Sequence, residues 1–217
     1  VVSPDDLVRD YGCDSLRMYE LFVGPPELDA EWDDRGIDGV NRFLKRLWNL
    51  LMDSKEADVQ PTKEMIKLRH KMVYDITNRL ESFSLNTVIS GFMEYNNKFI
   101  EMAKKEGGID KETLETIAVL LSPFAPHFAE EMWEQLGHGE TIFKAGWPSY
   151  DESAMKDDEI EVPVQINGKT RAVISISADA SKDEAIAAGK EAVADKLTGT
   201  IVKEIYVPKK IINIVQK

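Results

Sequence analysis

The chain has 217 residues, of which 43% are hydrophobic and 30% are charged, and its formal net charge is −12. This length and composition fit a globular protein of one large or two smaller domains, and we expect two. The charge argues against a simple nucleic-acid-binding protein, because phosphate neutralisation needs clustered lysine and arginine. No apolar run reaches the roughly 18 residues that a membrane-spanning helix needs, and the N-terminus lacks a signal-peptide pattern. A cytoplasmic protein without membrane contact is therefore expected.

A metal site and a catalytic centre are not expected. Cys13 is the only cysteine and is interpreted as a small packed residue. The histidines His70, His127 and His138 are scattered, with no pair at the i, i+4 spacing that grips a metal. No phosphate-binding loop, nucleophile elbow or HExxH motif is present. His127, near a helix start, is a candidate acid–base group, but a structural hydrogen bond is the preferred interpretation.

The first part of the chain predicts a set of helices. Ser3 should cap a short helix, and Asp14 should cap a second one that ends at the prolines Pro25 and Pro26. From Ile37 to Leu51, apolar residues recur at three- and four-residue steps, which predicts a long amphipathic helix. Short connections would make this helix and its successors antiparallel neighbours in a bundle. Four further helices are expected: after Pro61, from Leu85 to Gly107, after Asp110 and after Pro126.

The pattern changes after Tyr150, where an acidic segment from Asp151 to Glu159 is interpreted as a mobile linker. Beyond it, alternating strands flank Asn167-Gly168, the strongest short signal for a β-hairpin. A capping box at Ser181 predicts a helix that runs to about Leu197. Two more strands should turn at Pro208-Lys209-Lys210. The predicted fold class is therefore α+β, an antiparallel helical bundle followed by a small ββαββ domain.

Basic residues on two predicted helices are candidate contacts for an RNA backbone. On the first long helix they lie opposite the apolar stripe, which itself includes Trp48, and core packing of Trp48 is preferred over base stacking. A solvated helix face is the alternative interpretation for both groups. They are Arg42, Lys45 and Arg46 on the first long helix, and Lys63, Lys67, Arg69, His70 and Lys71 on the next.

The small domain is locally basic within an acidic protein. From Thr200 to Lys217, four lysines stand against one glutamate, which gives a local charge of +3. If the last strands pair with the hairpin, the basic residues of the hairpin and those of the last strands would share one edge of the sheet. Such an edge would suit a phosphate backbone. Protection of an exposed strand edge by lysine is an equally good interpretation. The residues are Lys169 and Arg171 after the hairpin turn, and Lys203, Lys209, Lys210 and Lys217 on the last strands.

A resemblance to class I aminoacyl-tRNA synthetases covers nearly the whole chain. The segment beyond the KMSKS catalytic loop of that family resembles the opening VVSPDDLVRDYGCDSLRMYELF. The anticodon-binding bundle of the Leu, Ile and Val group resembles GVNRFLKRLWNL near its start and LLSPFAPHFAEEMWEQLG near its end. The C-terminal module of bacterial-type leucyl-tRNA synthetases is similar to TIFKAGWPSYDE, VPVQINGKTRAVISIS and IYVPKKIINIVQK.

The resemblance implies a C-terminal fragment of such a synthetase, with a stem-contact segment at residues 1–36, an anticodon-binding bundle at 37–150 and a tRNA-binding α/β domain at 151–217. The parent enzyme would use ATP and Mg²⁺ to attach leucine to its tRNA and would edit misattached amino acids. The HIGH and KMSKS signatures are not in this sequence, so the fragment is expected to carry no catalytic residue and no cofactor. Its implied partners are tRNA(Leu) and the catalytic and editing domains, and a monomer is expected.

Two other functions stay open at this point. A helical scaffolding module that binds a protein partner and no RNA would fit the charge of −12. A salt-sensitive affinity for tRNA would argue against it, since each neutralised phosphate steepens the salt dependence. Alternatively, the fragment binds neither partner measurably because it lacks the avidity of the whole enzyme.

Overall fold

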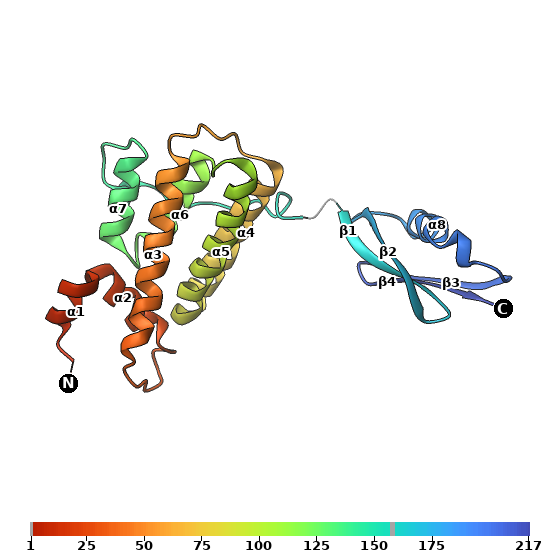
Figure 1. Ribbon diagram of the computed structural model, residues 1–217, viewed down its shortest axis with the longest axis horizontal. Coiled ribbons are helices and arrows are strands. Elements are labelled where there is room, and N and C mark those ends of the chain that lie inside the picture. The colour runs from red at the N-terminus through yellow and green to blue at the C-terminus, as the bar shows by residue number, and fades with distance from the viewer. Residues whose placement is uncertain (1, 157–158) are drawn as a thin grey trace. The chain divides into compact units, whose positions relative to one another are not determined.

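A computed structural model describes residues 2–156 and 159–217 of the chain. It divides into two compact units, Val1–Met155 and Lys156–Lys217, which we call the bundle unit and the sheet unit. The predicted acidic linker includes Asp157 and Asp158, which lie outside the described residues. The α+β fold class is confirmed, because a helical bundle precedes a small domain of the order ββαββ (Figure 1). Within the described ranges, no helix has the length and apolarity that crossing a membrane requires.

The helices of the bundle unit lie close to their predicted positions. The long amphipathic helix begins at Asp34, three residues before the first apolar residue of the pattern, Ile37. In chain order the helices are α1 (Pro4–Tyr11), α2 (Cys13–Phe22), α3 (Asp34–Ser54), α4 (Lys63–Glu81), α5 (Leu85–Glu106), α6 (Lys111–Leu121), α7 (Pro126–Gln135) and a 3-10 turn, η1 (Ile142–Lys144).

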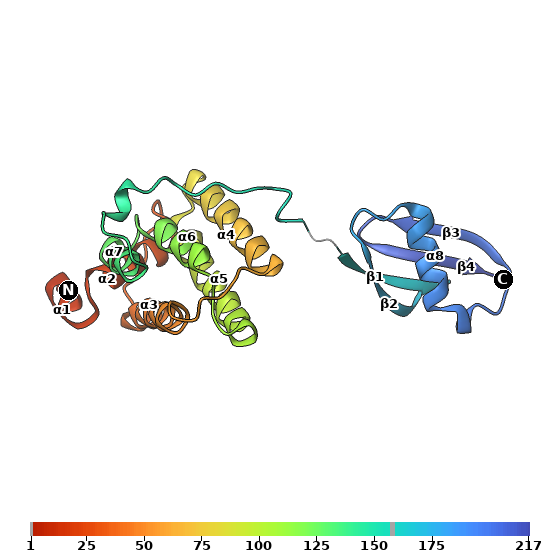
Figure 2. The same ribbon diagram turned by 90° about the horizontal axis from the view of Figure 1, so that it is seen from above.

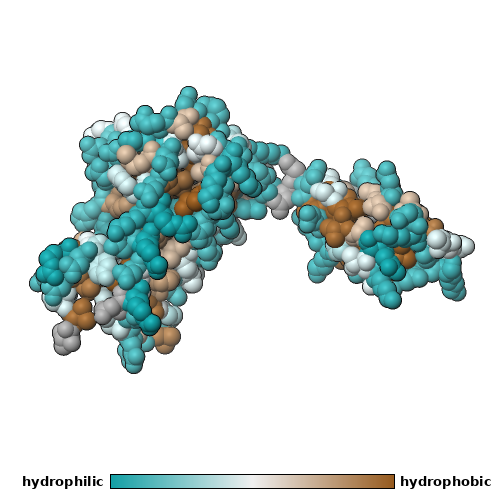
Figure 3. Space-filling view, in the orientation of Figure 1, coloured by the Kyte–Doolittle hydropathy of each residue, from teal (hydrophilic) through white to brown (hydrophobic). Residues whose placement is uncertain are grey.

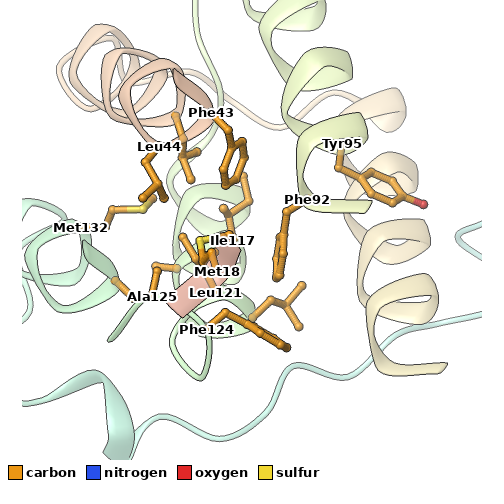
Figure 4. Packing of buried hydrophobic residues seen from close by; sticks show 14 of the residues in the cluster. Met18, Phe43, Leu44, Phe92, Tyr95, Ile117, Leu121, Phe124, Ala125 and Met132 are labelled. Carbon is orange, nitrogen blue, oxygen red and sulfur yellow. The ribbon is translucent and has the colours of Figure 1, made fainter. Parts of the chain in front are cut away.

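One core holds the bundle unit together. The stripe of α3 is buried as the periodicity predicts, and its Leu47 and Leu51 are at most 1% exposed. Figure 4 shows Phe43 of α3, Phe92 of α5 and Met132 of α7 pointing into this core. Met18 and Tyr19 of α2 belong to the same core, and the Tyr19 hydroxyl donates a hydrogen bond to the Asp33 carbonyl at 2.8 Å. The separate stem-contact segment at residues 1–36 stays a prediction.

One of the predicted helix caps is wrong, and another is confirmed in position only. Ser3 is the N-cap residue of α1, but its side chain makes no capping hydrogen bond. Asp14 lies inside α2, which begins at Cys13, and its Oδ2 instead accepts a hydrogen bond from Phe128 N at 2.6 Å. Asp14 therefore caps α7 from a distant point in the sequence. The predicted cap of α6 is confirmed, because the Asp110 side chain accepts from Thr113 N.

The sheet unit is a four-stranded sheet with one helix across one face (Figure 2). Its strand order is β2-β1-β4-β3, with β1 parallel to β4 and the other pairs antiparallel. A small core lies between sheet and helix, and Val162, Val164, Ile212 and Ile214 are fully buried there. The elements are β1 (Glu159–Ile166), β2 (Lys169–Ser177), α8 (Lys182–Ala192), a 3-10 turn η2 (Ala194–Lys196), β3 (Ile201–Val207) and β4 (Ile211–Gln216).

The predicted turn and capping box are confirmed. Asn167 and Gly168 both have positive φ, 49° and 79°, as the preferred two-residue hairpin turn requires. Ser181 and Glu184 exchange the two hydrogen bonds of a capping box at the start of α8. The predicted end of this helix is wrong, since α8 stops at Ala192 and not near Leu197. Val193 leaves helical geometry with φ −123° and is fully buried in the sheet-unit core.

Candidate nucleic-acid interface

The exposed face of α3 carries the first group of predicted RNA contacts. Arg42, Lys45, Arg46 and Asn49 are all exposed, because steps of three and four residues place them opposite the buried stripe. Across the described part of the chain, no acidic side chain pairs with Arg42, Lys45 or Arg46 within 4.0 Å. The pKa of Glu101 on α5 is lowered, mainly by its hydrogen bond with Lys104, and to a smaller extent by the charge of Arg46. The three cations therefore form a row available to an anionic ligand.

The basic residues of α4 do not form such a row. Arg69 is only 7% exposed, and its Nη1 lies 3.4 Å from Asp110 Oδ1 and 2.9 Å from Glu112 Oε2. This buried pair joins α4 to the start of α6, so Arg69 is not a solvated residue, and its burial argues against an RNA contact. His70 Nδ1 accepts a hydrogen bond from Asp151 N at 3.1 Å. At Arg69 and His70, the side chains of α4 therefore make contacts within the bundle unit.

The last strands pair with the hairpin as predicted, but the basic residues of the hairpin and those of the last strands do not share an edge of the sheet. Lys169 and Arg171 lie on β2 and Lys203 lies on β3, and these strands are the opposite edges of the sheet. The shared-edge prediction is therefore wrong. The parallel pairing of β1 with β4, unexpected from the sequence, places the two hairpins on either side of the sheet's centre.

Topology instead gathers four of the basic residues at one end of the sheet. The Asn167 side chain donates to Gln216 O at 3.0 Å and accepts from Gln216 N at 2.9 Å, which brings the hairpin turn beside the end of β4. Lys203 is the register partner of Val215. Lys196, which was not among the predicted contacts, also reaches this end and donates to Arg171 O at 3.2 Å. The predicted contacts gathered there, which we call the hairpin end, are Lys169, Arg171, Lys203 and Lys217.

Lys209 and Lys210 lie at the other end of the sheet, in the turn between β3 and β4. Six residues of β4 separate them from Lys217, a distance of about 20 Å for an extended strand. Lys210 N donates to Val207 O at 3.0 Å and closes the turn. Lys209 has φ 59°, a conformation that costs most L-residues on the order of 1 kcal/mol and glycine none. A charged side chain therefore occupies a position where glycine would be less strained.

The candidate acid–base group His127 has the structural partner that the sequence could not identify. Its Nδ1 lies 2.9 Å from Asp14 Oδ1, and its side chain is 75% exposed. Asp14 holds the start of α7 through both carboxylate oxygens, so the preferred structural interpretation is confirmed. Trp48, by contrast, is half-buried and meets the Phe128 ring edge-on at 5.8 Å. Within residues 2–156 and 159–217, no three His, Cys, Asp or Glu side chains cluster as metal ligands would.

Comparisons with known proteins agree with the fold and with the resemblance. Residues 62–186 match the family described as the anticodon-binding domain of tRNA ligase. Leucine–tRNA ligase of Fervidobacterium nodosum is 45% identical over the whole chain, which spans 29% of that protein. The corresponding protein of Phocaeicola vulgatus is 42% identical over 99% of the chain and 23% of its own length. The chain thus spans under a third of the relatives it matches.

A solved structure also matches the whole chain. The crystal structure of a ternary complex of Agrobacterium radiobacter K84 agnB2 LeuRS with tRNA and LeuAMS matches with a TM-score of 0.79 and 25% identity. The match covers 100% of this chain and 30% of that one.

Proposed function

The chain belongs to the anticodon-binding domain family of tRNA ligases, and we propose that it holds tRNA(Leu) for a leucine–tRNA ligase of which it forms a part. The observation that carries this proposal is the row of unpaired cations on α3. The bundle unit contains 17 basic and 29 acidic residues, so most cations of an acidic surface would be expected to have acidic neighbours. Arg42, Lys45 and Arg46 have none within ion-pair distance among the described residues.

In this proposal the two units supply binding energy, and the chemistry takes place elsewhere in the ligase. Contacts to phosphate and sugar fix the register of a nucleic acid without reading its sequence. Fixing the tRNA body in this way would keep its acceptor end near a distant active site, which lowers the entropic part of the barrier. The hairpin end and the turn at Lys209 would contribute two separate contact points. Both present exposed lysines in a unit with equal numbers of basic and acidic residues.

The remaining parts of the proposal concern the whole ligase. It would use ATP and Mg²⁺ to activate leucine in its catalytic domain and would hydrolyse wrong products in its editing domain. Hydrophobic pockets separate amino acids that differ by one methylene only about 10–200-fold, which is why editing is needed. We further propose that the ligase is a cytoplasmic monomer and that this chain's partners are tRNA(Leu) and those other domains.

The test is equilibrium binding of the 217-residue chain to leucine tRNA and to a second tRNA over a salt series. We expect the affinity for leucine tRNA to fall steeply with salt, with a slope of about −0.9 for each neutralised phosphate in duplex. The variant Lys209→Glu with Lys210→Glu should weaken binding and reduce the slope by about 2. The matched control reverses Lys111 and Lys144, which pair with Glu115 and Glu140, and should leave the affinity unchanged.

Absence of tRNA binding even at low salt would overturn the proposal for this chain. Salt-independent binding to a protein partner, with no affinity for tRNA, would instead support the scaffolding alternative. Equal losses in the double variant and in its control would mean that net charge alone governs the affinity.

A further inference from the structure

The bundle unit has a hollow where α2, α3 and α7 meet. Its volume is about 570 Å³, which is within the range of small-ligand sites. The junction of α1 and α2 at Gly12 and Cys13 forms one wall, α3 forms the floor, and the start of α7 at His127 and Phe128 forms the other wall. Figures 1 and 2 both show α7 beside α2 and α3 at this place.

Three polar side chains of α3 border the hollow at regular intervals. Asn41, Lys45 and Asn49 follow one another at four-residue steps, so successive members are about 6 Å apart along the helix. In the described ranges none of the three makes a hydrogen bond or ion pair within the chain. An amide both donates and accepts, and an ammonium donates three hydrogen bonds. The row therefore offers unused donors and acceptors next to a cation.

The apolar and aromatic residues of the lining are Tyr11, Leu44, Trp48 and Phe128. The Trp48 side chain packs on Phe128 by an edge contact, is half-buried and borders the hollow. Its indole N–H has no hydrogen-bond partner among the described residues. Trp48 thus packs against the core with one part of its side chain and leaves another part accessible. A flat apolar surface beside amides and a cation suits a nucleobase attached to a phosphate.

The charges around the hollow favour an anionic ligand. The one carboxylate in its lining, Asp14, is occupied by Phe128 N at 2.6 Å and by His127 Nδ1 at 2.9 Å. Arg42 and Arg46 follow Asn41 and Lys45 by one residue and extend the cationic row along α3. The acids of α3 that face solvent nearby, Asp38 and Asp53, lie beyond the two ends of the row of Asn41, Lys45 and Asn49.

We propose that this hollow binds one unstacked nucleotide of the tRNA. The base would lie against Trp48, the amides of Asn41 and Asn49 would contact its polar edges, and Lys45 would contact its phosphate. Arg42 and Arg46 would hold the neighbouring phosphates. This inference rests on the proposed function and adds to it a defined nucleotide subsite on the bundle unit.

A chain with Trp48 as its only tryptophan provides the first test. Trp32, Trp133 and Trp147 lie outside the lining of the hollow and are replaced by phenylalanine, and folding is checked by circular dichroism. Titration with leucine tRNA should quench the Trp48 emission and reduce its quenching by acrylamide, because a stacked base covers the indole. Unchanged emission at saturating tRNA would overturn the nucleotide subsite.

The second test uses the natural tryptophans, so it does not depend on the folding of the substituted chain. Asn41→Ala with Asn49→Ala should weaken tRNA binding about tenfold, the effect expected for two net hydrogen bonds. The control Asn97→Ala removes an exposed amide of α5 outside the hollow and should bind like the natural chain. Equal affinity of the double variant and the control overturns the subsite and leaves the proposed function standing. Failure of the natural chain to bind tRNA would overturn both.

Discussion

The bundle unit and the sheet unit differ in how their charge is distributed. Residues 156–217 contain ten basic and ten acidic residues, so the whole net charge of −12 belongs to residues 1–155. The net charge of −12, which argued against RNA binding, therefore does not describe the sheet unit. Even in the bundle unit, Arg42, Lys45 and Arg46 of α3 share one exposed helix face and form no ion pair within 4.0 Å among the described residues. For a binding surface, the local arrangement of charges is more informative than their total.

The two units also differ in the size of their cores. The bundle core contains Phe99, Met18 and many other large side chains, whereas the core residues of the sheet unit, such as Val162 and Ile212, are all aliphatic. Apolar residues such as Val173 and Val202 stay more than half exposed in the sheet unit, and Figure 3 shows apolar surface on that unit. Small cores supply only about 3–5 kcal/mol of stability. The sheet unit should therefore respond more strongly to single changes.

The largest expected contrast comes from the same truncation made in both cores. Ile214→Ala in β4 and Ile76→Ala in α4 each remove a fully buried side chain, at a cost of about 2–5 kcal/mol. We expect Ile214→Ala to unfold the sheet unit, while Ile76→Ala leaves the bundle folded. Unfolding of the sheet unit is measured by hydrogen exchange of the amides of β1 and β4. The folded state of the bundle is measured by tryptophan fluorescence, since all four tryptophans lie in residues 1–155. Protected strand amides in Ile214→Ala would contradict the contrast.

A smaller effect is expected at the buried ion pair of the bundle unit. Asp110→Ala removes the cap of α6 and leaves the buried Arg69, among the described residues, with the exposed Glu112 as its only acidic partner. We predict a loss of about 3 kcal/mol in the free energy of unfolding, measured by urea denaturation with tryptophan fluorescence. Glu112→Ala is the control and should cost less than about 1 kcal/mol, because Glu112 is exposed. Similar costs for the two substitutions would show that burial does not set the strength of this contact.

The hairpin turn of the sheet unit should give an effect of similar or lower size. Asn167→Ala places alanine at φ 49° and removes both hydrogen bonds to Gln216. The expected loss is about 1–2 kcal/mol, measured by hydrogen exchange of the sheet amides. Gln165→Ala, on the strand before the turn, is the comparison variant. If the two substitutions lower the stability equally, the hydrogen bonds between Asn167 and Gln216 make no specific contribution to it.

The smallest effect concerns pH and the capping box of α8. Hydrogen bonds from the Ser181 backbone and hydroxyl lower the pKa of Glu184 below its ordinary 4.5. A lowered pKa means that the ionised carboxylate stabilises the fold, so its contribution is complete above pH 4.5 and is lost as the pH falls through the lowered value. Amide shifts of α8 followed from pH 6 to pH 3 should show this loss. Glu184→Gln should abolish that titration, and a titration that persists in the variant would assign it to another group.

Local signals predicted most of the elements, and the contacts between distant segments decided the rest. Apolar periodicity located α3 to α7, and Asn167-Gly168 located the hairpin, because each depends on neighbours in sequence. The roles of Asp14 and Arg69 were not predictable, since each side chain binds a partner on another helix. The parallel contact of β1 with β4 likewise determined which lysines gather at the hairpin end. The hollow beside Trp48 needs three helices to form.

Lysine footprinting of the chain with and without leucine tRNA tests the proposed interface most directly. The chain is acetylated at low reagent concentration, and each lysine is quantified by mass spectrometry. Lysines paired with acids on the surface, Lys111 and Lys144, serve as internal references. We predict that tRNA protects Lys45, Lys169, Lys203, Lys209, Lys210 and Lys217 and leaves the references unchanged. Uniform modification with and without tRNA, or protection confined to the reference lysines, would contradict the assignment of these residues to the RNA.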